Sequence, residues 1–369
     1  MMHKNDLDTP CLLLERSLFD RNVRLMLERA AIAGKALRPH AKTHKCSQIA
    51  REQLEAGNCV GICAAKVSEA YALAEAGIEN ILITSPVTTP AKIEQLLACA
   101  ARTRECLVVV DNLDNACQLN EAAARLPAPL PILLDLDPEM GRTGIAFSEA
   151  PEFAHRLHAM PNLSLRGIQC YAGHLQHLRN TDERHRESRR LMQKAAQVFR
   201  QLQGEGLPMQ IFTGTGTGTA SSDLEIPELT DIQVGSYCVM DAEYAAVENP
   251  EHLLFEQFCP ALTLVTTVIS NNHDSHVTVD AGLKALYFTP ETPPRVVRQG
   301  LPLPGWRYEW FCDEHGKLFF PGEKPALGER IELCLPHCDP TINLHDEIHV
   351  IDHGKLVGRW KIDLRGKVY

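Results

Sequence analysis

One segment with residue types suited to covalent chemistry follows the first predicted strand. It reads Arg38-Pro-His-Ala-Lys-Thr-His-Lys45, with Lys42 between two histidines. A lysine that burial and nearby cations keep partly neutral can form an imine with an aldehyde, and His40, His44 and Lys45 would supply such cations. The alternative is a basic, solvated loop, because most lysines are surface residues.

A second segment alternates threonine with glycine. Its members are Thr213, Gly214, Thr215, Gly216, Thr217, Gly218 and Thr219. Alternating glycines let backbone N–H groups turn towards an anion, and the hydroxyls add donors. The segment lacks both the GK[ST] of a Walker loop and the G-x-G-x-x-G of a dinucleotide site. It therefore indicates a phosphate site of another kind, with a merely flexible loop as the alternative.

Two further segments carry polar side chains just after predicted strands. Asp137-Pro-Glu-Met-Gly-Arg-Thr-Gly144 contains Arg142, and Gln169-Cys-Tyr-Ala-Gly-His-Leu-Gln-His177 contains Tyr171 and two histidines. A structural ion pair is the alternative for Arg142, and capping or core packing for His174. Together with the lysine and the glycine-rich loop, these side chains predict an active site at the strand ends.

A fifth motif, Leu335-Pro-His-Cys-Asp-Pro340, contains potential metal ligands. If it is extended, His337 and Asp339 share one face and can bind a metal, because side chains alternate along a strand. Imidazole plus carboxylate suits Mn²⁺, Mg²⁺ or Co²⁺. If the segment turns instead, Cys338 with His337 would suit zinc; a histidine–aspartate hydrogen bond without metal is the third interpretation. The spacing of His345, His349 and His353 predicts positions at strand ends or the surface.

These motifs need a scaffold, and residues 30 to 245 supply alternating apolar runs and amphipathic stretches typical of βα units. Eight strands are predicted: 36–39, 60–65, 81–84, 106–110, 132–136, 165–170, 210–213 and 231–234. Helices are predicted at 47–56, 68–76, 90–101, 112–124, 148–158 and 182–203, with Gly57, Gly77 and Gly204 at their ends. The pattern predicts a (β/α)8 barrel of the TIM type, with an open doubly wound sheet as the alternative.

Beyond residue 250 the pattern changes to short β-rich runs separated by Pro and Gly, which predicts an all-β domain. The strand-like residues 9–14 would join it. We therefore expect residues 20–248 to form the barrel, and residues 1–19 plus 249–369 to form the β domain that carries the metal motif.

Composition narrows the function further. A net charge of −10 and the absence of an apolar run long enough to span a bilayer argue against nucleic-acid and membrane partners. The start is polar rather than signal-like. Thirteen scattered cysteines without a CxxC pair are typical of reduced thiols, so a cytoplasmic location is expected.

The motifs together resemble those of the fold-type III pyridoxal-phosphate enzymes that include D-threonine aldolases, D-serine dehydratases and D-threo-3-hydroxyaspartate dehydratases. The resemblance covers nearly the whole chain. Besides the segments quoted above, it includes Asp8-Thr-Pro10, Gln233-Val-Gly-Ser-Tyr237 with Met240-Asp241, Val279-Asp-Ala-Gly-Leu-Lys284 and Asp313-Glu-His-Gly316.

By this resemblance Lys42 rather than Lys45 would bind pyridoxal 5′-phosphate as a Schiff base on an alanine-racemase-type barrel. Tyr171 would contact the cofactor, Arg142 its ring or phenolic oxygen, and Thr213 to Thr219 with Tyr237 its phosphate. His337 and Asp339 would bind a divalent metal (Mn²⁺, Mg²⁺ or Co²⁺, with Zn²⁺ as the alternative), and His177 would act as a base on the substrate hydroxyl. The family is usually homodimeric.

The metal motif favours one branch of the family. His-x-Asp is similar to bacterial D-threonine aldolases, whereas His-x-Cys is typical of zinc-dependent D-serine dehydratases. The resemblance therefore implies a metal-activated aldolase that cleaves D-threonine and other D-β-hydroxy-α-amino acids to glycine and an aldehyde. A D-serine or D-threo-3-hydroxyaspartate dehydratase is the alternative; metal-free racemases and non-catalytic cofactor-binding proteins share the barrel.

Overall fold

The computed structural model describes residues 2–247, 257–298 and 300–369, and the chain divides into two compact units. The barrel unit comprises Leu27–Lys42, Ile49–Gly235 and Gly366–Tyr369. The β unit comprises Met1–Met26, Thr43–Gln48 and Ser236–Arg365. The domain boundary expected at residues 248 and 249 lies outside the described residues.

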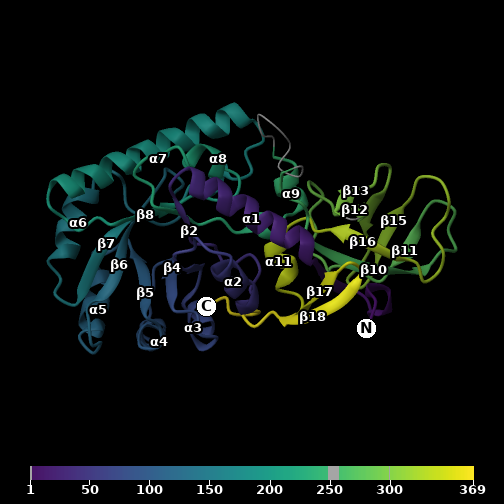
Figure 1. The fold of residues 1–369 in the computed structure, drawn as a ribbon, viewed down its shortest axis with the longest axis horizontal. Helices are drawn as coiled ribbons and strands as arrows, with labels where there is room; N and C mark the ends of the chain where they lie inside the picture. The colour runs from purple at the N-terminus through teal and green to yellow at the C-terminus, as the bar shows by residue number, and fades with distance from the viewer. Residues whose placement is uncertain (1, 248–256, 299) are drawn as a thin grey trace. The chain divides into compact units, whose positions relative to one another are not determined.

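Eight parallel strands form the sheet of the barrel unit (Figure 1). They are β2 (Ala36–Leu37), β3 (Ile62–Ala64), β4 (Asn80–Ile83), β5 (Glu105–Val110), β6 (Leu130–Leu136), β7 (Leu163–Cys170), β8 (Ile211–Gly214) and β9 (Asp231–Ile232). Their order is β2-β9-β8-β7-β6-β5-β4-β3. The two ends meet where Ala41 N donates to Cys63 O and Cys63 N donates to Pro39 O, both at 2.8 Å. The sheet therefore closes into the predicted barrel, and the open-sheet alternative is wrong.

The strands are recognisable in the sequence because both of their faces are buried, which favours continuous apolar runs. Residues 106–110 of β5 are all buried. One cluster joins side chains of neighbouring strands: Cys63, Leu82, Leu107, Val109 and Leu133, with Ile211 packed against it. This core fixes the strand ends that carry the predicted site.

Helices alternate with the strands and lie on the outer side of the sheet (Figure 1). They are α2 (Ser47–Glu55), α3 (Val67–Glu75), α4 (Pro90–Ala100), α5 (Leu113–Ala123), α6 (Ala150–His158), α7 (Thr181–Gly204) and the short α8 (Ala220–Asp223), while α1 (Arg16–Ile32) precedes β2. The side chains of Thr89, Asn112 and Asn180 cap α4, α5 and α7 by accepting a hydrogen bond from a first-turn N–H.

Two of the three expected helix-ending glycines adopt the left-handed conformation. Gly57 has φ 99° after α2, and Gly77 has φ 83° after α3. Gly204 is the last residue of α7, as expected, and the positive φ of 85° falls two residues later, at Gly206. Both positions carry glycine, and sequence alone does not distinguish them.

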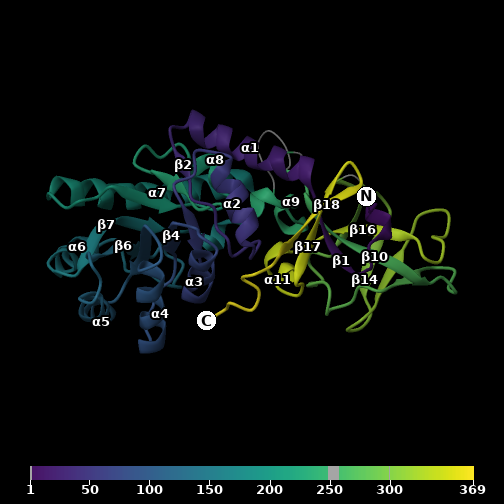
Figure 2. The same ribbon diagram turned by 60° about the horizontal axis from the view of Figure 1, so that its bottom comes forward.

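The β unit contains one large sheet, and the predicted N-terminal strand lies within it. Strand β1 (Cys11–Glu15) pairs antiparallel with β10 (Leu262–Ser270) and parallel with β17 (Glu347–Asp352) (Figure 2). The other strands are β11 (Val277–Val279), β12 (Arg295–Arg298), β13 (Leu301–Pro302), β14 (Arg307–Trp310), β15 (Gly316–Phe319), β16 (Arg330–Cys334) and β18 (Lys355–Lys361). Short helical turns are η1 (Lys4–Asp6), η3 (Ser236–Cys238), α9 (Ala242–Ala245) and α11 (Cys338–Ile342).

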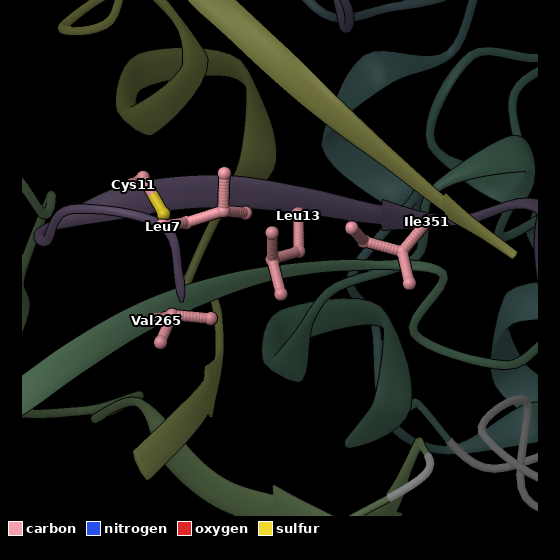
Figure 3. Close-up of a cluster of buried hydrophobic side chains, with 5 residues drawn as sticks. All are labelled: Leu7, Cys11, Leu13, Val265 and Ile351. Atoms are coloured by element: carbon pink, nitrogen blue, oxygen red, sulfur yellow. The ribbon is translucent and has the colours of Figure 1, made fainter. Parts of the chain in front are cut away.

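Strand β1 is held by a hydrophobic cluster as well as by its hydrogen bonds. Cys11 and Leu13 of β1 pack with Leu7, Val265 and Ile351 (Figure 3). Burial of such side chains stabilises a fold by roughly 1.5 to 3 kcal/mol each. In the described part of the chain, no helix is both long enough and apolar enough to cross a membrane.

Candidate active site

Lys42 lies partly buried in the turn after β2, at the carboxyl end of the first barrel strand. Its backbone N–H donates to Nδ1 of His40 at 3.4 Å, and Nε2 of His40 lies 3.1 Å from Thr84 Oγ1. An Nδ1 that accepts a hydrogen bond carries no proton, so this arrangement favours a neutral imidazole. The geometry therefore does not support the expected positive charge on His40.

The strand order places Lys42 and the Gly-Thr loop (residues 213–219) on the same rim of the barrel. β2 and β8 are both direct neighbours of β9, and the loop begins in β8. Neighbouring strands lie about 4.8 Å apart, so the two strand ends are roughly 10 Å apart. A single small cofactor can span that separation.

The threonines of the Gly-Thr loop divide into two kinds. Thr213 Oγ1 donates to Asp231 Oδ1 at 2.6 Å, and Thr219 Oγ1 donates to Asp223 Oδ2 at 2.7 Å. Because these two hydroxyls already donate to carboxylates, they are not available to donate to a phosphate. Backbone amides near Thr215 to Thr217 are the better candidates for phosphate donors. Thr215 has φ 73°, a rare conformation for a β-branched residue that costs about 1 to 3 kcal/mol and concentrates at functional sites.

The glycines of this loop are required by close packing from behind. A Cβ on Gly214 would overlap the carbonyl of Cys170, and one on Gly216 or Gly218 would overlap Gln176. The loop therefore lies flat against Cys170 and the segment after β7, with residues 213–219 buried. The arrangement fits a phosphate group.

Arg142 and Tyr171 come together although they follow different strands. The guanidinium carbon of Arg142 lies 5.3 Å from the centre of the Tyr171 ring, a cation–π distance. Because β6 and β7 are neighbours, their ends bring the two side chains to one place on the rim. A planar cation and an aromatic ring in contact could hold a flat aromatic cofactor.

Asp135, near the end of β6, is a site residue that the sequence reasoning missed. It is buried and accepts hydrogen bonds from Gln169 Nε2 and Thr143 Oγ1, both at 2.9 Å. Burial raises the pKa of Asp135 to about 6, against the effect of these hydrogen bonds. An aspartate inside the apolar run from Ile132 to Leu136 was the available signal, because a charged residue there must face the barrel interior.

A polar chain continues from Gln169 across the barrel. Gln233 Nε2 donates to Gln169 Oε1 at 3.1 Å and to Thr213 Oγ1 at 3.2 Å. Asp231, which accepts from Thr213, also forms a buried ion pair with Arg38 at 3.0 Å. Interior hydrogen bonds thus connect Asp135 to the first residue of the Gly-Thr loop.

The two histidines after β7 have exposed side chains. His174 lies in the turn η2 (Gly173–Leu175), so core packing is not its role. His177 follows two residues after that turn. An exposed imidazole held on a short segment near Tyr171 could exchange protons with a bound molecule.

The predicted metal motif is not extended, so the expectation that His337 and Asp339 share one face of a strand is wrong. Residues Cys338–Ile342 form the helix α11, and His337 is its N-cap. Proline is compatible with a first helical turn, and Thr341 Oγ1 donates to the carbonyl of His337 at 2.9 Å. His337 and Asp339 therefore belong to one helix start, where the charge of Asp339 acts on His337.

Asp241 orients His337 and was not recognised from the sequence as a site residue. The buried Asp241 Oδ2 lies 3.0 Å from His337 Nδ1 and accepts from Cys338 N at 3.1 Å, while its Oδ1 accepts from Tyr244 N. Burial lowers the pKa of His337, but the hydrogen bond and charge of Asp241 outweigh it and raise that pKa to about 9. With Nδ1 directed at a carboxylate, Nε2 is the nitrogen that could bind a metal.

The turn that a zinc site with Cys338 would require is present, but the thiol points elsewhere. Cys338 Sγ donates to Met240 O at 3.3 Å, and burial raises its pKa well above the ordinary value. Zinc binds the thiolate, so the geometry favours the oxygen and nitrogen ligands. Within the described residues no three His, Cys, Asp or Glu side chains gather as a metal site; water and substrate would complete the coordination of His337 and Asp339.

The remaining predicted residues of the β unit, three histidines and Tyr237, lie in different surroundings. His345 Nε2 lies 2.7 Å from Ala285 O, His349 pairs with Glu347 at 3.1 Å, and His353 is exposed. Tyr237 is fully buried, and its ring lies edge-on to Phe258 at 6.1 Å. A phosphate contact by Tyr237 stays a prediction.

Comparisons with known proteins agree with this architecture. Residues 15–243 match the family model for the alanine racemase N-terminal domain, and residues 261–351 match a putative serine dehydratase domain. A D-threonine aldolase from Arthrobacter sp is 38% identical over 97% of this chain and 93% of its own length.

Two further proteins are similar over nearly their whole length. A 3-hydroxy-D-aspartate aldolase from Paracoccus denitrificans (strain Pd 1222) is 33% identical over 100% of this chain and 95% of its own. The crystal structure of a D-threonine aldolase from Filomicrobium marinum superposes with a TM-score of 0.92 and 34% identity, covering 99% of this chain and 97% of that one.

Proposed function

Because the chain belongs to the D-threonine aldolase and D-serine dehydratase-like family of pyridoxal-phosphate enzymes, we propose that it cleaves D-threonine and other D-β-hydroxy-α-amino acids to glycine and an aldehyde. The observation that carries the proposal is the barrel rim itself: Lys42 and the Gly-Thr loop lie two strands apart, Tyr171 follows the next strand, β7, and Arg142 contacts it from the end of β6. The relatives named above are aldolases for this substrate class.

Different residues of the rim would bind different parts of the cofactor. Bound pyridoxal phosphate supplies an electron sink for charge that develops at the substrate α-carbon. Lys42 would bind its aldehyde carbon covalently, and the amides of the Gly-Thr loop would hold its phosphate. Arg142 and Tyr171 would fix the plane of the ring, which decides which substrate bond stands perpendicular to it.

His337 and Asp339 would bind a divalent cation, and Asp241 would hold the His337 ring in position. Mn²⁺, Mg²⁺ or Co²⁺ suits these ligands better than Zn²⁺, because Cys338 is turned towards Met240. Such a cation would supply Lewis acidity to a substrate hydroxyl. The carboxylates of Asp241, Asp339 and Glu243 surround His337 with negative charge, which favours a cation.

His177 would act as general base on the β-hydroxyl of the substrate. Its imidazole is exposed on a segment that Tyr171 begins, so it can meet a substrate bound to the rim. General-base catalysis of this kind contributes about 10²- to 10⁴-fold to a rate.

A product assay tests the proposed reaction. Wild-type protein incubated with pyridoxal phosphate, Mn²⁺ and D-threonine should release glycine and acetaldehyde in equal amounts, and L-threonine should give neither. A preparation of Lys42→Ala protein serves as the blank. Formation of 2-oxobutyrate and ammonia without glycine would contradict the aldolase proposal.

The same outcome would support the second candidate, a D-serine or D-threo-3-hydroxyaspartate dehydratase. The match of residues 261–351 to a putative serine dehydratase domain supports this second candidate. Both reactions use the same cofactor and the same substrate hydroxyl, so only the products distinguish them.

We also propose that the protein is a homodimer in the cytoplasm. The β unit exposes Leu283, Tyr287, Trp310 and Phe311, and Leu283 N donates to Cys312 O at 3.4 Å, which places two of these segments together. Exposed apolar side chains gathered in this way are typical of subunit interfaces. Light scattering should give twice the chain mass, and a monomer mass would contradict this proposal.

A further inference from the structure

The segment between Tyr171 and Leu178 packs against the back of the Gly-Thr loop, and Gln176 is its main contact. The Gln176 side chain is buried. Its Oε1 accepts from Gly218 N at 3.0 Å, and its Nε2 donates to Thr219 Oγ1 and to Ala172 O, both at 3.1 Å. One amide therefore joins the end of the Gly-Thr loop to the turn that precedes His177.

Arg184, in the first turn of α7, makes the second connection. It is almost completely buried, and its Nε donates to Gly218 O at 2.9 Å. Its Nη1 donates to Leu178 O and to Arg179 O, the latter at 3.3 Å. A planar guanidinium holds several carbonyls in one fixed arrangement.

The two connections meet on opposite sides of one residue. Gln176 and Leu178 flank His177. The Gln176 side chain bonds directly to Gly218, and Arg184 bonds to both Leu178 and Gly218. The N–H of Gly218 is held from one side and its carbonyl from the other. Gly218 is therefore linked by hydrogen bonds to residues on both sides of His177.

We infer that Gln176 and Arg184 are positioning residues that couple phosphate binding in the Gly-Thr loop to the placement of His177. This inference rests on the proposed function, in which the loop binds the phosphate and His177 is the base. A phosphate on the loop amides fixes Gly218; Gln176 and Arg184 pass that constraint to residues 175–178. Cofactor binding should therefore further restrain the segment that carries the base.

The coupling has a physical advantage for catalysis. A misplacement of about 1 Å in a catalytic group can reduce a rate on the order of 10²-fold. His177 is exposed and lies between the turn η2 and helix α7. Backing contacts from the phosphate loop help to hold it without covering the imidazole.

Hydrogen exchange measured by mass spectrometry tests the coupling directly. Cofactor-free wild-type protein is compared alone, with pyridoxal phosphate, with inorganic phosphate and with pyridoxal, which lacks the phosphate. We expect pyridoxal phosphate and inorganic phosphate to slow exchange in peptides covering residues 213–219 and 172–178, whereas pyridoxal should leave residues 172–178 unchanged.

The decisive variant is Gln176→Met, which keeps the side-chain length but removes all three hydrogen bonds. Phosphate should then protect residues 213–219 but no longer residues 172–178. The matched control, Gln193→Met on the exposed face of α7, should behave like wild type. Arg184→Lys, which keeps the charge but loses the planar fork, provides a second variant and should also uncouple the two segments.

Kinetics give an independent readout at saturating pyridoxal phosphate. Gln176→Met should reduce kcat about 10- to 100-fold and change the KM for D-threonine by less than about threefold, because positioning acts on the reaction more than on binding. Protection of residues 172–178 that persists in both variants would overturn the inference and leave the proposed function standing. If phosphate protects neither segment in wild-type protein, the proposed phosphate site fails as well.

Discussion

Replacing Lys42 by alanine should abolish the visible absorbance of protein-bound pyridoxal phosphate and reduce kcat on the order of 10³-fold or more, because the variant lacks the amine that binds the cofactor aldehyde. Lys42 lies at the end of β2, whereas Lys45, three residues later, is buried in the β unit. The measurement is an absorbance spectrum of the protein after dialysis against cofactor-free buffer, followed by the D-threonine assay.

The control for this experiment is Lys45→Asn. Lys45 has φ 49°, and asparagine tolerates that left-handed conformation better than most residues. This variant should keep the absorbance and most of the activity. If the absorbance survives in Lys42→Ala and disappears in Lys45→Asn, the cofactor is bound by Lys45 and the assignment to Lys42 is wrong.

Removing the metal should abolish cleavage while leaving the cofactor in place. EDTA treatment is expected to eliminate activity with the visible spectrum intact, and Mn²⁺ should restore it. In His337→Ala protein Mn²⁺ should restore nothing, because one of the two protein ligands is gone. In Asp241→Ala protein the Mn²⁺ concentration for half-maximal activity should rise about 10- to 100-fold, the usual effect of losing the group that orients a ligand.

His353→Ala is the matched control, because His353 is exposed near Asp352. It should respond to EDTA and Mn²⁺ as wild type does. Full activity of the wild-type protein in EDTA would contradict a catalytic metal and would favour metal-independent chemistry. A Cys338→Ala variant that no longer responds to Mn²⁺ would revive the zinc interpretation.

The barrel was predictable because its strands are buried on both faces. Every predicted barrel strand has a counterpart, and the N-terminal strand joins the β unit as expected. Strands β12 to β15 were not predicted. They have four residues or fewer, and β13 contains only Leu301 and Pro302, so they are too short for an apolar pattern to reveal, and pairing with neighbouring strands determines them.

The site was predictable in its residue types but not in its contacts. The sequence indicates Arg142 and Tyr171 separately, whereas their stacking depends on how two strand ends adjoin. For the metal motif the error was local: His337 begins a helix, because Asp241, far away in the sequence, accepts from both the His337 ring and the Cys338 backbone. A buried carboxylate such as Asp241 or Asp135 resembles any other aspartate until its partners are known.

The position of β1 has a consequence for synthesis on the ribosome. Leu12 pairs with Leu264 and also with Ile348, near the other end of the chain. Strand β1 therefore stays unpaired while the barrel strands are translated. The barrel strands from β3 to β8, by contrast, pair with neighbours in sequence order. Because contacts distant in sequence form slowly and unpaired strand edges aggregate, the β unit is the part of the nascent chain that would most need protection.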